Sequence, residues 1–374
     1  MFMNHNDKLI SEVIKFLRFP LIVCVVMIHS HFQNISMGGL DYGFDIQTYP
    51  IYCNISFFLS KIISSIAVPL FFIFSGYLFF KNVSSFTPEE YFKKLHKRIR
   101  TLLMPYIFWN IVVILIYLVA QTIMPNMISG NNKLIADYTT IDWIKAFWNY
   151  HNEMPICYQF WFIRDLMVVV LLSPIIYFAI KKIRFFFVLI MGIIWLLNIN
   201  TGITGVSITA IFFFSIGALF TITQYDIISF LKKIKILGYT ISLMLIIVEM
   251  CLYNYRASID SFFSDIQSIM LYKVCTLSLI VSCLNITVTL LRGGLLKTNE
   301  FLYDSNFFIY AYHTMPLVLF LKLIIRFLNP TSDIHITLVY FIVPIITILF
   351  GLMFFAVIRR IFPRFTRFIT GSRI

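Results

Sequence analysis

The chain has 374 residues, of which 60% are hydrophobic and only 13% are charged, and its mean hydropathy is +0.87. A soluble domain carries about 25% charged residues, so this composition excludes a soluble globular protein and requires lipid to cover the remaining apolar surface. The net charge of +13 would favour nucleic acid in a soluble protein, but no zinc-finger, RNA-binding or helix-turn-helix pattern accompanies it, and we reject nucleic acid as a partner.

The apolar segments predict an all-α polytopic membrane protein with about ten transmembrane helices, in one domain that covers residues 1–374. A helix needs roughly 20 apolar residues to cross the hydrocarbon core. The ten candidate segments are 14–33, 57–80, 105–124, 159–180, 186–199, 208–223, 237–254, 267–291, 304–327 and 336–358. The fifth and sixth are short, and a broken or re-entrant pair around the stretch NINTGITGV is the alternative for them.

The positions of Lys and Arg predict the side of the membrane that each loop occupies. Ten spans put both termini on one side, and the loops of that side hold 22 of the 30 Lys and Arg residues. Cytoplasmic loops are the ones enriched in these residues, so both termini are predicted to be cytoplasmic. The longest outer loops are then 34–56 and 125–158. The basic N-terminus resembles a secretory signal, but Arg18 and His29 interrupt its apolar stretch, which indicates a retained first helix.

Arg18 and His29 lie eleven positions apart in the first predicted span. Eleven residues of α-helix make three turns plus about 20° and rise about 16 Å, so both side chains share one face. Ionisable groups inside a membrane are costly and usually face the interior of the bundle, which makes both residues candidates for function. For Arg18 the alternative is that its side chain only extends to the cytoplasmic headgroups.

Two further motifs lie around the second and third spans. The stretch VPLFFIFSGYLFF contains Gly76, a small residue that permits close helix approach and is typical of packing. The stretch YFKKLHKRIRTLLMPY leads into the third span and carries the cations Lys97, Arg98 and Arg100, followed by Tyr106. Such basic runs set topology and contact anionic lipid. The functional alternative is a clamp for phosphate, which arginine binds with two parallel hydrogen bonds.

The fourth and ninth spans also contain ionisable residues. The fourth begins with QFWFIRDL, which places Arg164 and Asp165 near the depth of His29. An Asp can orient and charge-balance an imidazole, and the alternative is a local ion pair facing the outer loop. The ninth contains YAYH, which places Tyr310 and His313 in mid-membrane. A buried structural histidine is the alternative to a binding role there.

The six cysteines show no C-x-x-C spacing, so no metal site is predicted. Cys53 and Cys157 both fall in predicted outer loops. A disulfide between them is chemically possible in an oxidising periplasm, and Cys251 is an alternative partner. Two buried free thiols are the expected state, because the sequence does not show the separation of the Cα atoms.

The order of these motifs resembles the membrane acyltransferase 3 family, whose members acylate bacterial surface polysaccharides and related glycans. The motifs are Arg-x10-His, VPLFFIFSGY, KRIR…PY, QFWFIRDL and YAYH, and they run from Phe16 to about Leu319. The resemblance implies a ten-helix core in the bacterial inner membrane. It also implies transfer of an acyl group, with acetyl as the default, from cytoplasmic acyl-CoA to a carbohydrate hydroxyl.

By this resemblance Arg18 and His29 carry the family's essential Arg and His, and Lys97 and Arg100 match its Arg-x-x-Arg motif, with Lys in the first place. We expect His29 to act as a general base or to orient the thioester. The residues expected to be catalytic are His29, Arg18 and Asp165. Those expected to bind acyl-CoA are Arg98, Arg100, Lys97 and Tyr106. Those expected to contact the acceptor are Trp161, Arg164, Tyr310, His313 and Glu153, of which Arg164 is the candidate to stabilise the oxyanion and Glu153 the alternative to Asp165 beside the imidazole.

Three other functions remain open at the level of the sequence. A transporter or flippase for a lipid-linked glycan would use the same intramembrane charges as a solute path. Such transporters often show broken helices in both halves, whereas only one short pair is predicted here. A glycan polymerase would be excluded by binding of CoA, and a membrane sensor would need an effector domain that the chain does not show.

Overall fold

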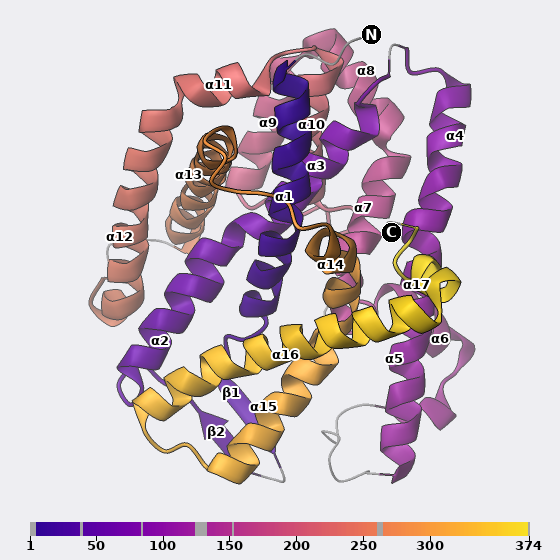
Figure 1. Cartoon of the computed structure of the whole chain (residues 1–374). Coiled ribbons are helices and arrows are strands. Elements are labelled where there is room, and N and C mark those ends of the chain that lie inside the picture. The colour runs from indigo at the N-terminus through magenta and orange to yellow at the C-terminus, as the bar shows by residue number, and fades with distance from the viewer. Residues whose placement is uncertain are drawn as a thin grey trace.

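The computed structural model of the chain describes all residues except 1–4, 38–39, 84, 124–132, 152, 260–264 and 373–374. It is a bundle of helices with one short antiparallel hairpin, β1 (Asn34–Met37) and β2 (Leu40–Gly43), in which Asn34 pairs with Gly43 (Figure 1). The helices are α1 (His5–Ile28), α2 (Pro50–Ser56), α3 (Ala67–Phe80), α4 (Pro88–Arg98), α5 (Met104–Ile123), α6 (Thr140–Trp148), α7 (Trp161–Leu171), α8 (Ser173–Ile183), α9 (Phe185–Leu196), α10 (Ile208–Ile222), α11 (Ile227–Lys233), α12 (Lys235–Ile259), α13 (Asp265–Arg292), α14 (Glu300–Tyr312), α15 (Thr314–Leu328), α16 (Asp333–Ile361) and α17 (Pro363–Ile369). The predicted all-α class is therefore confirmed apart from the hairpin, and the first part of the predicted outer loop 125–158 lies outside the described residues.

Several helices begin where a short polar side chain accepts a hydrogen bond from a backbone N–H of the first turn. Thr139 and Asp142 form a capping box at α6. Hydrogen bonds from the Lys133 ammonium and from Thr139 hold the pKa of the Asp142 carboxyl below its usual value. The other caps of this kind are Thr87, Ser207, Asp226, Asn299 and Ser332. They satisfy donors that a helix cannot satisfy itself, so they fix where these helices start.

Five helical segments of the described chain are long and apolar enough to cross a membrane, and three bent pairs raise the number to eight. The five are Pro50–Phe80, Pro88–Ile123, Lys235–Tyr255, Asp265–Arg292 and Asp333–Ile361. The predicted count of about ten is not confirmed. The two remaining predicted spans correspond to α1, which carries Glu12, Lys15 and Arg18, and to α9, which has only 12 residues.

The three bent pairs are α7 with α8 at 60°, α10 with α11 at 114°, and α14 with α15 at 70°. Two of these bends lie just before a proline, at Leu172 before Pro174 and at His313 before Pro316. Proline has no N–H to bond the preceding turn, and its ring crowds the carbonyl four residues earlier. A proline thus accompanies two of the three bends, and one of these places His313 at a break in a helix.

Helices α3 and α10 cross with their backbones in contact. A Cβ atom on Gly76 would lie 2.0 Å from the Phe214 carbonyl oxygen, and one on Gly217 would lie 1.9 Å from the Ile73 carbonyl oxygen. No side chain fits in either place, so two glycines set the distance between the two helices. The predicted packing role of Gly76 is confirmed.

Large apolar side chains remain exposed along α5, α12 and α16, among them Leu115, Leu243 and Leu349. Only lipid can cover such continuous faces, so the chain is a membrane protein. We call the end of the bundle where α1 begins and α8 ends (Figure 1) the basic end, because Lys8 lies in the first turn of α1 and Lys181 and Lys182 lie in the last turn of α8. The opposite end, with β1 and β2, is the hairpin end.

Candidate active site

His29 follows α1 directly, and its ring lies beside Tyr158 and His313. The ring centroids are 5.2 Å apart in both pairs, and the Tyr158 hydroxyl is 3.5 Å from His29 Nδ1. Toward the other end of α1, Arg18 donates to the Tyr303 hydroxyl over 2.8 Å and stacks on its ring. Both residues thus face α14, in agreement with the single helix face that their spacing predicts.

His313 is fully buried at the break between α14 and α15. Its Nδ1 lies 2.8 Å from the Tyr310 carbonyl oxygen and 3.2 Å from the Ile309 carbonyl oxygen. A carbonyl oxygen can only accept, so Nδ1 must carry the hydrogen and Nε2 of the neutral ring must hold a lone pair. No described residue donates to Nε2. The site therefore contains a buried, unused hydrogen-bond acceptor next to His29.

The one-turn segment η6 (Tyr158–Phe160) is attached to the same break. The Gln159 amide donates to the Ala311 carbonyl over 2.9 Å, and its oxygen accepts from the Thr314 hydroxyl over 3.1 Å. The Tyr310 hydroxyl donates to the Gln159 carbonyl over 2.6 Å. These bonds fix Tyr158 relative to His313. Sequence reasoning singled out Tyr310 and His313 but missed Tyr158, Gln159 and Thr314.

Tyr106 packs against the segment η6. Its contacts lie there and not with Lys97, Arg98 or Arg100, the cations with which it was predicted to bind acyl-CoA. It is buried, its ring stacks on Phe160 with centroids 5.8 Å apart, and its hydroxyl donates to the Phe147 carbonyl. Phe160 in turn stacks on Tyr310 at 5.6 Å. Three aromatic rings thus form a column beside the site, and the contacts of Tyr106 are those of a packing residue, while its role in binding acyl-CoA stays a prediction.

A small apolar cavity of about 100 Å³ lies between α1, α3, α7 and α14. Arg18 lines it together with Phe74 and Phe162, and Tyr310 lines it three residues before His313. We call it the apolar cavity. The two histidines do not line it, and Tyr310 is the lining residue nearest to His313 in the sequence.

The three cations expected to bind acyl-CoA, on α4 and just after it, differ in exposure, since one is partly buried and two are exposed. Arg98 lies over the Phe79 ring at 5.7 Å and is close enough to Arg18 for their charges to repel. Lys97 and Arg100 are exposed. No described carboxylate pairs with any of the three cations on this run. Of these cations, Arg98 is therefore the one that lies near Arg18, which lines the apolar cavity.

Arg164 and Asp165 are both buried, and they bind each other instead of His29. Asp165 Oδ1 accepts from Arg164 Nε at 3.0 Å and from Nη2 at 2.9 Å, while Arg164 Nη1 donates to the carbonyls of Trp148 and Glu153. The structure thus contains the local ion pair that was the alternative interpretation, and Asp165 does not contact His29 in it. The catalytic roles expected for Asp165 and Arg164 stay predictions.

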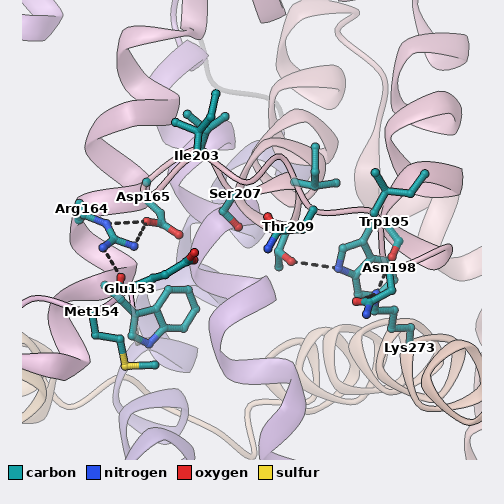
Figure 2. Close-up of a pocket in the computed structure, with 16 residues that line it drawn as sticks. Glu153, Met154, Arg164, Asp165, Trp195, Asn198, Ile203, Ser207, Thr209 and Lys273 are labelled. Atoms are coloured by element: carbon teal, nitrogen blue, oxygen red, sulfur yellow. Dashed lines mark hydrogen bonds and ion pairs between the residues drawn. The ribbon is translucent and has the colours of Figure 1, made fainter. Parts of the chain in front are cut away.

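A second cavity of about 320 Å³ lies on the other face of α7, and we call it the polar cavity (Figure 2). Its walls are the start of α7, the end of α9, the loop 197–207 and the first turns of α10 and α13. Glu153 and Trp161, both predicted to contact the acceptor, line it. Lys273 and Asn198, which sequence reasoning did not single out, line it as well.

All six cysteines are free thiols, and both Cys53 and Cys157 are buried. The expected state is therefore confirmed, and no disulfide closes the loops at the hairpin end. The backbone N–H of Cys157 instead donates to the Asn110 side chain over 3.1 Å. A hydrogen bond to Asn110 on α5 and the packing of Cys157 thus fix the residue that precedes η6.

Comparison with known proteins gives one family. A model described as an acyltransferase domain matches residues 12–368, which is nearly the whole chain and includes both cavities and the two histidines. No curated protein and no solved structure matched the chain. The match over this length shows the family that the ordered motifs resemble, and the chain belongs to the acyltransferase 3 family.

Proposed function

We propose that the protein transfers a short acyl group, acetyl by preference, from acyl-CoA to a hydroxyl of a carbohydrate. The observation that carries the proposal is the cluster of His29, Tyr158 and His313 beyond an apolar cavity whose other end holds Arg18. A titratable ring, a hydroxyl donor and a buried acceptor at one point are the groups that acyl transfer uses. The family supports acyl transfer in general.

The donor enters at the basic end. Arg18 and Arg98 converge there without a described carboxylate partner, and two guanidinium groups bind the phosphates of CoA well. The apolar cavity beyond them has a volume of about 100 Å³. A space of this size suits a short acyl group.

The reaction moves one proton in two transfers. The acceptor hydroxyl attacks the thioester carbonyl, the carbon–sulfur bond breaks, and the hydroxyl proton passes to His29. The CoA thiolate then leaves and takes that proton, which restores neutral His29 and gives an ester and free CoA. The Tyr158 hydroxyl, 3.5 Å from His29, is the nearest donor for the developing oxyanion.

His313 takes the part that was predicted for Asp165. Its Nε2 lone pair can accept from a His29 N–H as the imidazolium forms, in the way that a carboxylate does in a catalytic triad. A neutral partner stabilises the charge less than a carboxylate does. It also avoids placing a second full charge in a dry site, which would be costly.

A matched series of histidine variants tests the proposal. His29→Asn and His313→Asn are compared with His31→Asn, whose ring contacts Ser56 and not the other two histidines. Purified protein is incubated with acetyl-CoA and extracted surface glycan, and both the free CoA thiol and glycan-bound acetyl are measured. We expect His29→Asn to lose about 10²–10⁴-fold in rate, the contribution of general base catalysis. His313→Asn should lose less, and His31→Asn should stay within about twofold of wild type.

Membrane abundance and thermal unfolding are measured on the same samples, so that loss of fold is separated from loss of chemistry. Normal acetylation by a folded His29→Asn protein would exclude the base. Glycan mass spectra of cells with and without the gene identify the acceptor. If those spectra are identical while glycan export fails, the protein is a transporter and the proposal is wrong.

A further inference from the structure

The polar cavity and the apolar cavity lie on opposite faces of α7 and share no lining residue. Trp161, Arg164 and Asp165 face the polar cavity, whereas Phe162 and Ile163 face the apolar one. We propose that the polar cavity is the acceptor site and that it binds an uncharged sugar ring, with Lys273 and Glu153 selecting for it. This inference rests on the proposed function and adds the class of acceptor.

The cavity lies within reach of the reaction centre. Tyr158, whose hydroxyl approaches His29, is three residues before Trp161, which lines the cavity. Residues three apart on a helical segment are neighbours, with Cβ atoms about 5–6 Å apart. A sugar in the cavity can therefore present a hydroxyl past Trp161 to His29, while the thioester arrives from the other face of α7.

The charges of the cavity favour an uncharged ligand. Arg164 and Asp165 neutralise each other in its wall. Glu153 and Lys273 have no ion-pair partner among the described residues, and Figure 2 shows Glu153 directed into the cavity and Lys273 at its far side. One positive and one negative group give the cavity no net charge, so the attraction of a charged ligand to one of them is offset by repulsion from the other. Sugar hydroxyls donate to the carboxylate and accept from the ammonium, so one neutral ring satisfies both.

Lys273 is positioned for this role by three contacts. Its ammonium donates to the Trp195 carbonyl over 2.6 Å and to the Asn198 side-chain oxygen over 2.8 Å, and it lies over the Trp195 ring at 5.2 Å. An ammonium has three hydrogens, so one remains for a ligand. Trp195 and Trp161 both line the cavity and offer apolar ring faces, against which the C–H face of a pyranose can stack.

The wall opposite α7 is shaped by local contacts and by unusual backbone angles. In the loop 197–207, the Thr201 hydroxyl donates to the Val206 carbonyl over 2.7 Å. A Cβ on Gly205 would lie 3.0 Å from the Trp148 ring, and φ there is +91°. Asn198 and Glu153 also have positive φ, at +57° and +62°. Side chains rarely adopt this backbone conformation, and here it places two polar residues at the cavity.

Binding of three matched methyl pyranosides tests the inference: a glucoside without charge, a glucosaminide with an ammonium, and a glucuronide with a carboxylate. Tryptophan fluorescence of the full chain in lipid nanodiscs reports binding, because Trp161 and Trp195 line the cavity. We expect the glucoside to bind most tightly. Lys273→Met and Glu153→Gln should each weaken it at least about tenfold, the loss expected for one hydrogen bond to a charged group.

Lys133→Met is the matched control, because Lys133 is exposed and pairs with Asp142 away from the cavity. It should leave glucoside binding unchanged. Tighter binding of the glucuronide, or equal binding by Lys273→Met and wild type, would overturn the inference. Release of CoA from acetyl-CoA without acceptor is measured in parallel and should be the same in Lys133→Met and wild type. Glucoside binding without any turnover of acetyl-CoA would refute acyl transfer and leave the sugar site standing.

Discussion

Asp165 and His29 illustrate what the sequence shows at the scale of single residues. Their positions along two helices predict similar depth, and the interior location of both is correct. The sequence does not show which partner each side chain turns toward, because the partners belong to other segments of the chain. Arg164 donates to the carbonyls of Trp148 and Glu153, and in this position it also pairs with Asp165. The unpartnered Nε2 of His313 likewise depends on the tertiary fold and could not be predicted from the sequence.

Lys273 could have been singled out as a functional residue from the sequence. It is one of the few Lys and Arg residues that lie inside predicted spans on the outer side, where topology does not explain them. A cation in such a place is by default a candidate for function. Tyr158 and Gln159 gave no such signal, since tyrosine and glutamine are common at the ends of membrane helices.

The cations of α4 give a prediction at this scale. Arg98→Ala should raise the apparent Kd for CoA by about tenfold or more, because Arg98 faces inward toward Arg18. Arg100→Ala and Lys97→Ala should change it by less than about threefold, since both side chains are exposed. Titration of CoA at low and high salt measures all three. Equal effects of Arg98 and Arg100 would mean that the whole run binds phosphate.

At the scale of helices, most of the predicted segments coincide with described ones, but their bends were not predicted. Hydropathy averaged over a span does not register a break, although Pro174 and Pro316 mark two of them. Proline alone is not decisive, because Pro20 and Pro344 lie inside α1 and α16 without ending them. Whether a proline breaks a helix depends on the neighbours that can satisfy the freed carbonyl.

The crossing of α3 and α10 gives a prediction at this scale. Gly217→Ala should destabilise the protein by more than about 3 kcal/mol, beyond ordinary overpacking, because its Cβ would meet a backbone carbonyl that cannot rotate away. Gly293→Ala is the control, since a Cβ there makes only an ordinary contact at 3.4 Å. Thermal unfolding in detergent and yield from membranes measure both. Similar stability of the two variants would show that the helices can move apart.

At the scale of the whole molecule, we propose that the basic end is cytoplasmic and the hairpin end is outside, in a bacterial inner membrane. Both follow from the distribution of Lys and Arg and from the family, and the same orientation brings acyl-CoA to Arg18. The distribution of Lys and Arg can be counted in a sequence because it is a property of individual loops. The two cavities could not be predicted from the sequence, since each is formed by helices that are far apart in the chain.

Cysteine labelling tests the orientation. The exposed Cys251 is first replaced by serine, and single cysteines are then introduced at Lys93 on α4 and at Gln47 near the hairpin, both of which are exposed. A membrane-impermeant maleimide should label Gln47→Cys in intact spheroplasts and Lys93→Cys only after lysis. The reverse labelling pattern would show the opposite orientation, in which Arg18 and Arg98 lie away from the cytoplasmic CoA.

The column of Tyr106, Phe160 and Tyr310 has a consequence for the cell's energy supply. An enzyme with hollows reaching in from both faces of a bilayer risks becoming a leak, because each elementary charge falls through about 2.3 kcal/mol per 100 mV. Helix α7 lies between the two cavities, which share no lining residue, and the stacked rings of Phe160 and Tyr310 lie beside the start of α7. For the acyl transfer that we propose, this separation would keep ions and protons from following the substrates through the protein.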